Sequence, residues 1–269
     1  MVAHKTYEIL KKTLQQKLDD LYIEDVVVGM HMTAIKLNDQ SFGVASTIDA
    51  SEIFCPKKDR DYGEFTPTKI KGKKVTELFE TTKQSNIIST LKIAVLNAIS
   101  SNIIASSNYI VHNNTDPYDL LDLSQSKTVT IVGAFQSYIK KFAKTHHKLF
   151  VLELNENALN EDQKEYFVPA SDFQKVLPSS DIVIITGLTI VNNTIEGLLS
   201  SVQKNTKVIV TGPSSSMIPD VLFENNVNYI GAVRVTDGKK LFEVVGQGGH
   251  GYHLFYYCAE KICIVNEKQ

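Results

Sequence analysis

Short runs of Val and Ile that stop at a glycine-containing turn constrain this chain more than any other feature. Asp181–Gly187 and Lys207–Ser216 each hold three or four consecutive apolar residues followed by Thr-Gly. A run without polar alternation is typical of a parallel strand buried on both faces. Open α/β sheets bind their ligands at the turns that follow such strands. We therefore expect the functional residues to lie on these turns.

The same pattern occurs on both sides of this pair. Lys127–Gly133 leads into a helical pattern at Tyr138–Thr145, Lys148–Glu153 follows, and Val227–Gly231 closes the set. Strand, helix and strand at this spacing predict right-handed βαβ units. The sequence therefore predicts an α/β fold with a Rossmann-like, doubly wound parallel sheet in the carboxyl-terminal half.

The amino-terminal half has a different pattern. Met1–Lys12 indicates an amphipathic helix, and two β-rich runs, Glu24–Leu37 and Ser41–Thr47, flank a short polar turn that is typical of an antiparallel hairpin. Apolar residues recur at helical spacing over Ile87–Ile104. This mixture predicts a smaller α+β domain.

The composition sets limits on size, partners and location. A chain of 269 residues is long enough for two cores, and we expect domains at residues 1–124 and 125–269. The formal net charge is -2, which favours neither nucleic acid nor an anionic membrane as a partner. The start lacks the apolar segment of a signal peptide, so a cytoplasmic location is expected. The oligomeric state is left open.

The three cysteines, Cys55, Cys258 and Cys263, form no Cys-x-x-Cys pair and predict no disulfide framework. His250 and His253 lie beside a glycine run close to Cys258 and Cys263. Imidazole and thiolate together favour a soft or borderline metal. Buried thiols and surface imidazoles are the alternative, so a metal ion is a candidate cofactor whose ligands the spacing does not identify.

Gly133 ends one expected strand, and Glu153 ends the next about twenty residues later, the spacing at which a dinucleotide fold holds a ribose hydroxyl. The turn after Gly133 has one glycine where the dinucleotide fingerprint needs three, and Phe135 would crowd a pyrophosphate. We therefore expect no NAD here, and an adenosyl or other small ligand is favoured instead. Glu153 is equally compatible with a surface carboxylate.

The turns at Thr186-Gly187 and Gly212-Pro213-Ser214 together are stronger evidence for a ligand site than either turn is alone. A helix expected over Met217–Phe223 would leave free backbone N–H groups in the second turn, which suits an anion. A serine that only caps this helix is the alternative.

Three amide or hydroxyl residues complete the candidates. Asn192 and Thr194 open the helix between the two turns, with Asn192 as a candidate ligand contact and Thr194 or Asn193 as the cap. Asn97 lies on the apolar side of its helix and must find a partner, structural or ligand. We expect the site to straddle the two halves, with Gly133, Thr186 and Gly212 on one wall and Asn97 or the Gly29–Thr33 segment on the other.

Five segments, taken in order, resemble a prokaryotic family described as putative heavy-metal chelation: Val28–Ile35, Leu96–Ala98, Ile131–Phe135, Thr186–Thr194 and Thr211–Ser216. The resemblance covers nearly the whole chain. It implies that a domain like the amino-terminal domain of enolase packs against a Rossmann-like domain, with the site between them. It implies no role for the cysteines or histidines.

Two functions follow from these observations. The resemblance implies a metal-handling protein that binds a metal ion or a small anionic metal chelate between the domains. The residues also fit an enzyme acting on a small anionic metabolite or nucleotide-like ligand, with Ser214–Ser216 holding the anion and Glu153 as acid or base. A module that binds a partner without any chemistry is a third possibility.

Overall fold

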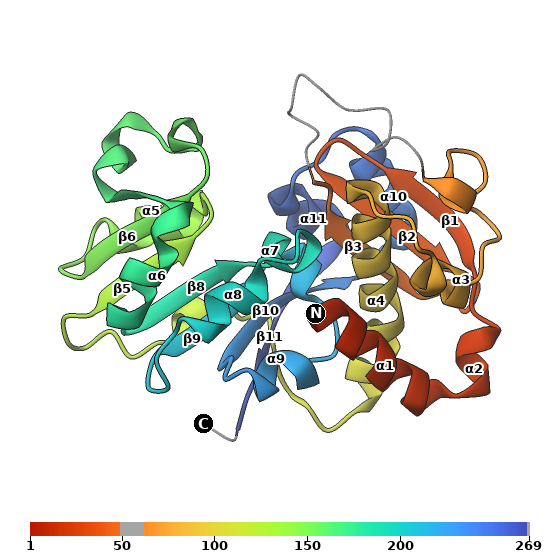
Figure 1. The fold of residues 1–269 in the computed structure, drawn as a ribbon, viewed down its shortest axis with the longest axis horizontal. Helices are drawn as coiled ribbons and strands as arrows, with labels where there is room; N and C mark the ends of the chain where they lie inside the picture. Colours follow the sequence, from red (N-terminus) through yellow and green to blue (C-terminus); the bar gives the residue numbers. More distant parts are fainter. Residues whose placement is uncertain (49–61, 268–269) are drawn as a thin grey trace.

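The computed structural model describes residues 1–48 and 62–267 (Figure 1). Cys55 and part of the loop that precedes Lys74 lie outside the described residues. Two sheets organise the fold, one of eight strands and one of three.

The eight-stranded sheet has the order β4-β11-β10-β9-β8-β5-β6-β7. All neighbours from β10 to β7 are parallel, and the two pairs that involve β11 are antiparallel. The strands are β4 (Ile110–Asn113), β5 (Thr128–Val132), β6 (Lys148–Glu153), β7 (Phe167–Pro169), β8 (Ile182–Thr186), β9 (Lys207–Thr211), β10 (Tyr229–Val235) and β11 (Ala259–Val265).

The strand order reverses between β5 and β8. From β5 the chain continues to β6 on one side, and it returns to place β8 on the other side. The connections that follow β5 and β8 therefore run in opposite directions along the sheet, which leaves a crevice at the carboxyl ends of these strands. Gly133 and Gly187 are the first residues after the two strands that flank the crevice.

Helices cover both faces of the large sheet, as Figure 1 shows. Ile139 and Phe142 of α5 pack in one core cluster with Val129 and Ile131 of β5, whereas Leu198 of α8 packs in the cluster on the other face. The helices of this half are α5 (Gln136–Phe142), α6 (Phe173–Val176), α7 (Leu188–Val191), α8 (Ile195–Ser200), α9 (Asp220–Glu224), α10 (Gly238–Gly246) and α11 (Gly251–Tyr257).

The small sheet consists of β1 (Ile23–Val28), β2 (Met32–Leu37) and β3 (Phe42–Ser46), all antiparallel. The sequence predicts one hairpin here, but the run from residue 24 to 37 is broken by a tight turn in which the Gly29 N–H donates to the Met32 carbonyl. The first expected strand is therefore two. The helices of this half are α1 (Val2–Leu14), α2 (Gln16–Asp19), α3 (Val75–Glu80) and α4 (Asn86–Ser106).

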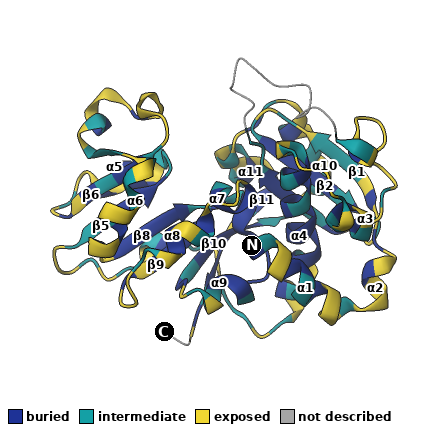
Figure 2. Cartoon of the chain, viewed as in Figure 1, coloured by how far each residue is buried: buried dark blue, intermediate teal, exposed yellow. Residues whose placement is uncertain are grey.

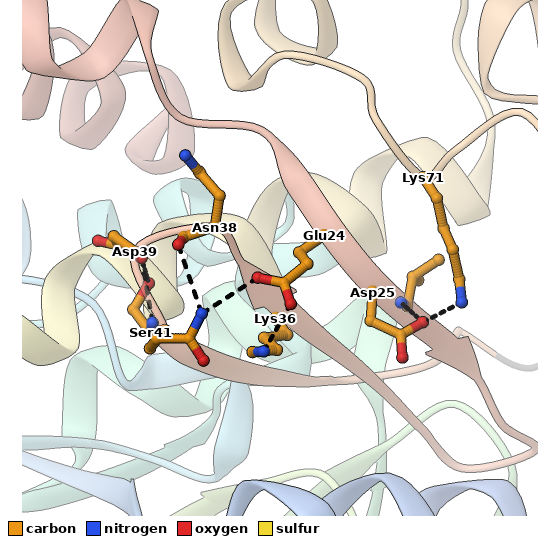
Figure 3. A network of polar contacts seen from close by, with 9 residues as sticks. Glu24, Asp25, Lys36, Asn38, Asp39, Ser41 and Lys71 are labelled. Atoms are coloured by element: carbon orange, nitrogen blue, oxygen red, sulfur yellow. Dashed lines mark hydrogen bonds and ion pairs between the residues drawn. The ribbon is translucent and has the colours of Figure 1, made fainter.

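Polar contacts link neighbouring strands and a turn of the small sheet (Figure 3). Lys36 pairs with Glu24 at 2.6 Å across β1 and β2, and the Gln40 amide donates to Glu24 at 3.2 Å. In the turn before β3, Asp39 accepts from both the amide and the hydroxyl of Ser41. Exposed pairs of this kind contribute little stability.

The helix α4 lies across the small sheet and joins it to the rest of the molecule. By length and composition this helix could cross a membrane. However, 67% of its most apolar stretch is buried inside the molecule. Its buried residues belong to a core cluster that also includes Val183 and Val210 of the large sheet. Figure 2 shows this continuous buried interior beneath exposed outer helix faces.

The expected fold class is confirmed. The carboxyl-terminal half contains a large, mostly parallel sheet with helices on both faces, and the amino-terminal half contains a small α+β unit. The domain boundary at 124/125 stays a prediction. Strand β4, which precedes that boundary in sequence, is an edge strand of the large sheet.

Candidate functional site

A cleft of about 710 Å³ lies at the carboxyl ends of β5, β8, β9 and β10. Its walls come from both halves of the chain, because Met32 of β2 and Ser46 of β3 line it together with the turns of the large sheet. The start of α11 contributes His250 and Tyr252. A cleft at the point where strand order reverses is the usual position of a ligand site in such sheets.

Four of the residues expected at the site line this cleft: Phe135, Thr186, Gly212 and Pro213. Thr186, Gly212 and Pro213 lie close together because Thr186 pairs with Thr211 at the ends of the neighbouring strands β8 and β9. Gly212 has a φ of 127°, a backbone conformation that favours glycine. The turn after β9 can therefore bend sharply toward the neighbouring turn.

Gly133 and Gly187 are next to residues that line the cleft, and they allow its turns to pack together. Gly133 has a φ of 97°, and a Cβ atom there would lie 3.0 Å from Cγ2 of Thr186. A Cβ atom at Gly187 would lie 3.0 Å from the Ser215 amide nitrogen. Both positions need glycine for close packing of one turn on another.

Three further expected site residues, Glu153, Asn192 and Thr194, lie away from the cleft and are engaged locally. Glu153 is half-buried and accepts hydrogen bonds from the amides of Leu154 and Asn155 in its own loop. Asn192 accepts from both the amide and the hydroxyl of Thr194, at 3.2 and 2.7 Å, in an exposed turn that opens α8. All three side chains are engaged in local structure.

Asn97, Thr33 and Ser214 are buried, and Asn97 and Ser214 connect the two halves of the chain. The Asn97 Nδ2 donates to the carbonyls of Val44 and Pro213, and Thr33 shares a hydrogen bond with the Thr47 hydroxyl at 2.9 Å. Ser214 is fully buried, and its hydroxyl accepts from the Ser46 amide at 2.8 Å. These contacts favour the structural alternative for Asn97, and they engage Thr33 and Ser214 in hydrogen bonds inside the protein.

The turn after β9 differs from the expectation. The sequence predicts a helix over Met217–Phe223, but α9 spans only Asp220–Glu224, because Pro219 disfavours helical geometry in the residue before it. Residues 213–215 form a single 3-10 turn instead. The serines therefore do not stand at the start of a helix long enough to create a strong dipole.

Asp116, Tyr138 and Lys261 form a polar cluster in the cleft wall. Tyr138 donates to Asp116 at 2.5 Å, and Lys261 pairs with the same carboxylate at 2.9 Å. Burial alone would raise the pKa of Asp116, but these donated hydrogen bonds hold it below its ordinary value. Burial, and then the charge of Asp116, raises the pKa of Tyr138 far above its usual range. At neutral pH the cluster contains a carboxylate, a phenol and an ammonium group.

The two described cysteines are buried. Burial raises the pKa of Cys258 to about 11 and that of Cys263 to about 12, so both thiols stay protonated at neutral pH. Cys258 ends α11, whereas Cys263 lies on β11. Within residues 1–48 and 62–267, no group of three or more His, Cys, Asp or Glu side chains is arranged to hold a metal ion.

Two histidines from distant segments meet at the rim of the cleft. The rings of His31 and His250 stack with centroids 3.7 Å apart and planes inclined by 21°. Burial, and then the charges of His31 and His253, lowers the pKa of His250. His253 uses its Nδ1 to accept a hydrogen bond from the backbone N–H of His250.

Sequence reasoning missed most of the polar groups in this cleft. Asp116 falls in a segment whose composition is typical of a linker. Lys261 lies on the antiparallel strand β11, whose sequence lacks the uninterrupted apolar run that predicts a parallel strand. The helical pattern places Tyr138 in a helix and indicates nothing more. The one available signal is its position five residues after Gly133, because side chains in the first turn of such a helix face the crevice.

These features define a two-part α/β protein with a cleft where the strand order of its main sheet reverses. The chain belongs to the family described as putative heavy-metal chelation, whose model matches residues 116–264, more than half of the chain. A second family model with the same description matches residues 11–100.

Two solved structures from this family, both of proteins of unknown function, are similar to the chain. The protein from Pyrococcus horikoshii has a TM-score of 0.77 and 20% identity, and the match covers 99% of this chain and 100% of that one. The protein from Desulfitobacterium hafniense has a TM-score of 0.70 and 18% identity, with 97% and 99% covered. At this identity the likeness shows the fold. No curated protein matches the chain.

Proposed function

We propose that the cleft binds a metal ion or a small anionic metal chelate, and that the protein handles metal rather than transforming a metabolite. The family description supports the metal. The observation that carries the proposal is the character of the cleft walls, which combine imidazole nitrogen from His250, the ammonium group of Lys261 and aromatic rings. An imidazole can complete a metal's coordination, while the ammonium group and rings suit the anionic and organic parts of a chelator.

The proposal is tested with a substitution that places a larger side chain in the cleft without straining the backbone. Gly251 lines the cleft, and a Cβ atom there would lie 3.4 Å from the Met32 methyl group and 3.7 Å from Pro213, both ordinary contacts. Gly251→Leu should therefore fold normally and obstruct the cleft. Gly197→Leu, on the exposed side of α8, is the matched control, since only Phe173 comes within 3.9 Å of its Cβ position.

The proteins are titrated calorimetrically with Ag(I), Zn(II), Ni(II) and Co(II), each divalent metal both free and as its nitrilotriacetate complex. We expect at least one of these probes to bind wild type and the Gly197→Leu variant equally, and to bind the Gly251→Leu variant at least about tenfold more weakly. Equal binding to all three proteins would place any metal site outside the cleft and refute the proposal.

An enzyme acting on a small anionic metabolite is the second candidate, and the Asp116, Tyr138 and Lys261 cluster favours it. A phenol and an ammonium group that both contact one carboxylate can together bind an anion and transfer a proton. Turnover of any carboxylate or phosphate metabolite in a panel, lost in Tyr138→Phe, would support this candidate. An acid–base role for Glu153 and an anion-binding role for Ser214 have less support, because both side chains are engaged elsewhere.

A further inference from the structure

The stacked histidines lie where two loops from opposite ends of the chain are clamped together. His31 lies in the turn between β1 and β2, and His250 immediately precedes α11. A Cβ atom at Gly29 would lie 2.3 Å from the carbonyl oxygen of Val245, so the first loop touches the end of α10 through a bare glycine backbone. The close approach of the two loops therefore depends on glycine at position 29.

The second loop is held by the end of α10. The Gly248 N–H donates to the Val245 carbonyl and the Gly249 N–H donates to the Val244 carbonyl, and Gly248 has a φ of 77°. This is a Schellman motif, which ends a helix in a defined direction. This motif places His250 at the cleft rim and restricts the conformation of the backbone that precedes it.

Met32 completes the cluster from below. Its side chain is 7% exposed and lines the cleft, and its methyl group lies 3.4 Å from the Cβ position of Gly251, next to His250. Met32 and His250 therefore line the same end of the cleft, and His31 stacks on His250 there. A thioether is a soft ligand that selects monovalent copper over harder cations.

His253 orients the cluster and is not one of its metal ligands. Because its Nδ1 accepts the hydrogen bond from the His250 N–H at 2.9 Å, a neutral His253 carries its proton on Nε2. Neither nitrogen then offers a free lone pair to a metal. Its role is to fix the backbone of His250, as groups next to metal ligands commonly do.

The geometry points to a site for a soft monovalent cation, Cu(I) or Ag(I), ligated by His31, His250 and the Met32 thioether. This inference rests on the proposed function and names its metal class and protein ligands. The two rings stack face to face, so binding requires one imidazole to turn about its Cβ–Cγ bond until the in-plane lone pairs converge. Two imidazoles and a thioether suit a cation of low coordination number, whereas Zn²⁺ prefers four ligands.

The test uses Ag(I), which binds like Cu(I) and does not change oxidation state. Thiols bind Ag(I) strongly, so all proteins carry Cys55→Ser, while Cys258 and Cys263 are buried. Calorimetric titration should give one Ag(I) per chain. His31→Ala and His250→Ala should each weaken binding by roughly 100-fold, and His146→Ala, an exposed histidine far along the chain, should have no effect.

Met32→Leu separates the soft ligand from the imidazoles, because leucine has nearly the same volume without sulfur. It should weaken Ag(I) binding by roughly tenfold or more and leave any Zn(II) binding unchanged. Circular dichroism and thermal melting check that each variant is folded. Wild-type Ag(I) affinity in folded His31→Ala or His250→Ala, or tighter binding of Zn(II) than of Ag(I), would overturn the inference.

The two proposals fail in different ways. If a metal or nitrilotriacetate complex binds wild type, is blocked by Gly251→Leu and is unaffected by His31→Ala, the cleft function stands and the histidine site is refuted. If Ag(I) binding depends on His31 and His250 and is weakened by Gly251→Leu, both stand. If no probe binds, both are refuted.

Discussion

The Asn97 carboxamide on α4 donates a hydrogen bond of 3.0 Å to the Pro213 carbonyl in the turn after β9. Its second Nδ2 proton goes to the Val44 carbonyl at 2.8 Å, so one buried side chain ties together a helix, the small sheet and the wall of the cleft. Its Oδ1 has no hydrogen-bond partner among the residues that the structure describes. Asn97 therefore positions the cleft instead of lining it.

Removing this amide should destabilise the protein. Asn97→Ala removes one hydrogen-bond donor from each of two carbonyls and leaves a cavity, and we expect a loss of about 2–4 kcal/mol in the free energy of unfolding. Chemical denaturation monitored by circular dichroism measures the loss. Asn102→Ala on the exposed face of α4 is the control and should change stability by less than about 0.5 kcal/mol. Equal effects of the two substitutions would contradict the bridging role.

The contact between β3 and α4 predicts a second sensitive position. A Cβ atom at Gly43 would lie 2.0 Å from the Ala94 carbonyl oxygen and 2.5 Å from the Ala98 amide nitrogen. Both are backbone atoms of a helix, which cannot move aside cheaply. Gly43→Ala should therefore cost about 1–3 kcal/mol or more, measured by denaturant titration.

The control for Gly43 is a glycine with space around it. Gly197 lies in α8, and its Cβ position has only the Phe173 ring within 4 Å, at 3.9 Å. Gly197→Ala should stabilise the protein by about 0.5–1 kcal/mol, because alanine favours a helix and restricts the unfolded chain. A destabilising Gly197→Ala would show that the chosen control is not free of packing constraints.

The large sheet could be predicted from sequence because its strands are buried on both faces. The Val and Ile runs of β5, β8 and β9 have no polar alternation, and short runs of this kind between polar turns are typical of strands covered on both sides. The strands that escaped detection have mixed faces or are short. β11 includes Glu260 and Lys261, and β4 has four residues of which two are exposed.

The cleft was only partly predictable for a related reason. Thr186 and Gly212 follow strands that could be recognised, so the rule that ligands bind at strand ends located them. Asp116 and Lys261 are 145 residues apart and meet only because β4 pairs with β11. His31 and His250 meet only because Gly29 packs on α10. Contacts of this range leave no periodic signal in the sequence.

The Asp116 cluster should contribute to stability as well as to the cleft. Asp116→Asn removes the charge that accepts from Tyr138 and pairs with Lys261, and we expect a loss of about 1–3 kcal/mol at pH 7. Asp119→Asn, an exposed residue in the following turn, should be near neutral. Denaturant unfolding of both variants decides the matter. An Asp116→Asn protein as stable as wild type would show that the cluster is poorly packed or open to solvent.

His147 predicts how stability depends on pH. The side chain is 8% exposed, and its Nδ1 accepts a hydrogen bond from the Lys127 N–H at 3.2 Å. Burial, and then the charges of His146 and Lys127, lowers its pKa below the ordinary value of 6.5. The folded protein therefore binds this proton less readily than the unfolded chain does, and stability falls as the pH drops from about 6.5 through the lowered value.

The variant that tests this is His147→Asn, because the asparagine Oδ1 can replace Nδ1 as the acceptor without titrating. Urea denaturation at pH 7 and pH 5 should show a smaller loss of stability for His147→Asn than for wild type. His112→Asn on the exposed edge strand β4 is the matched control and should keep the wild-type difference. An unchanged pH dependence in His147→Asn, or an equal reduction in His112→Asn, would show that the buried imidazole is not the group responsible.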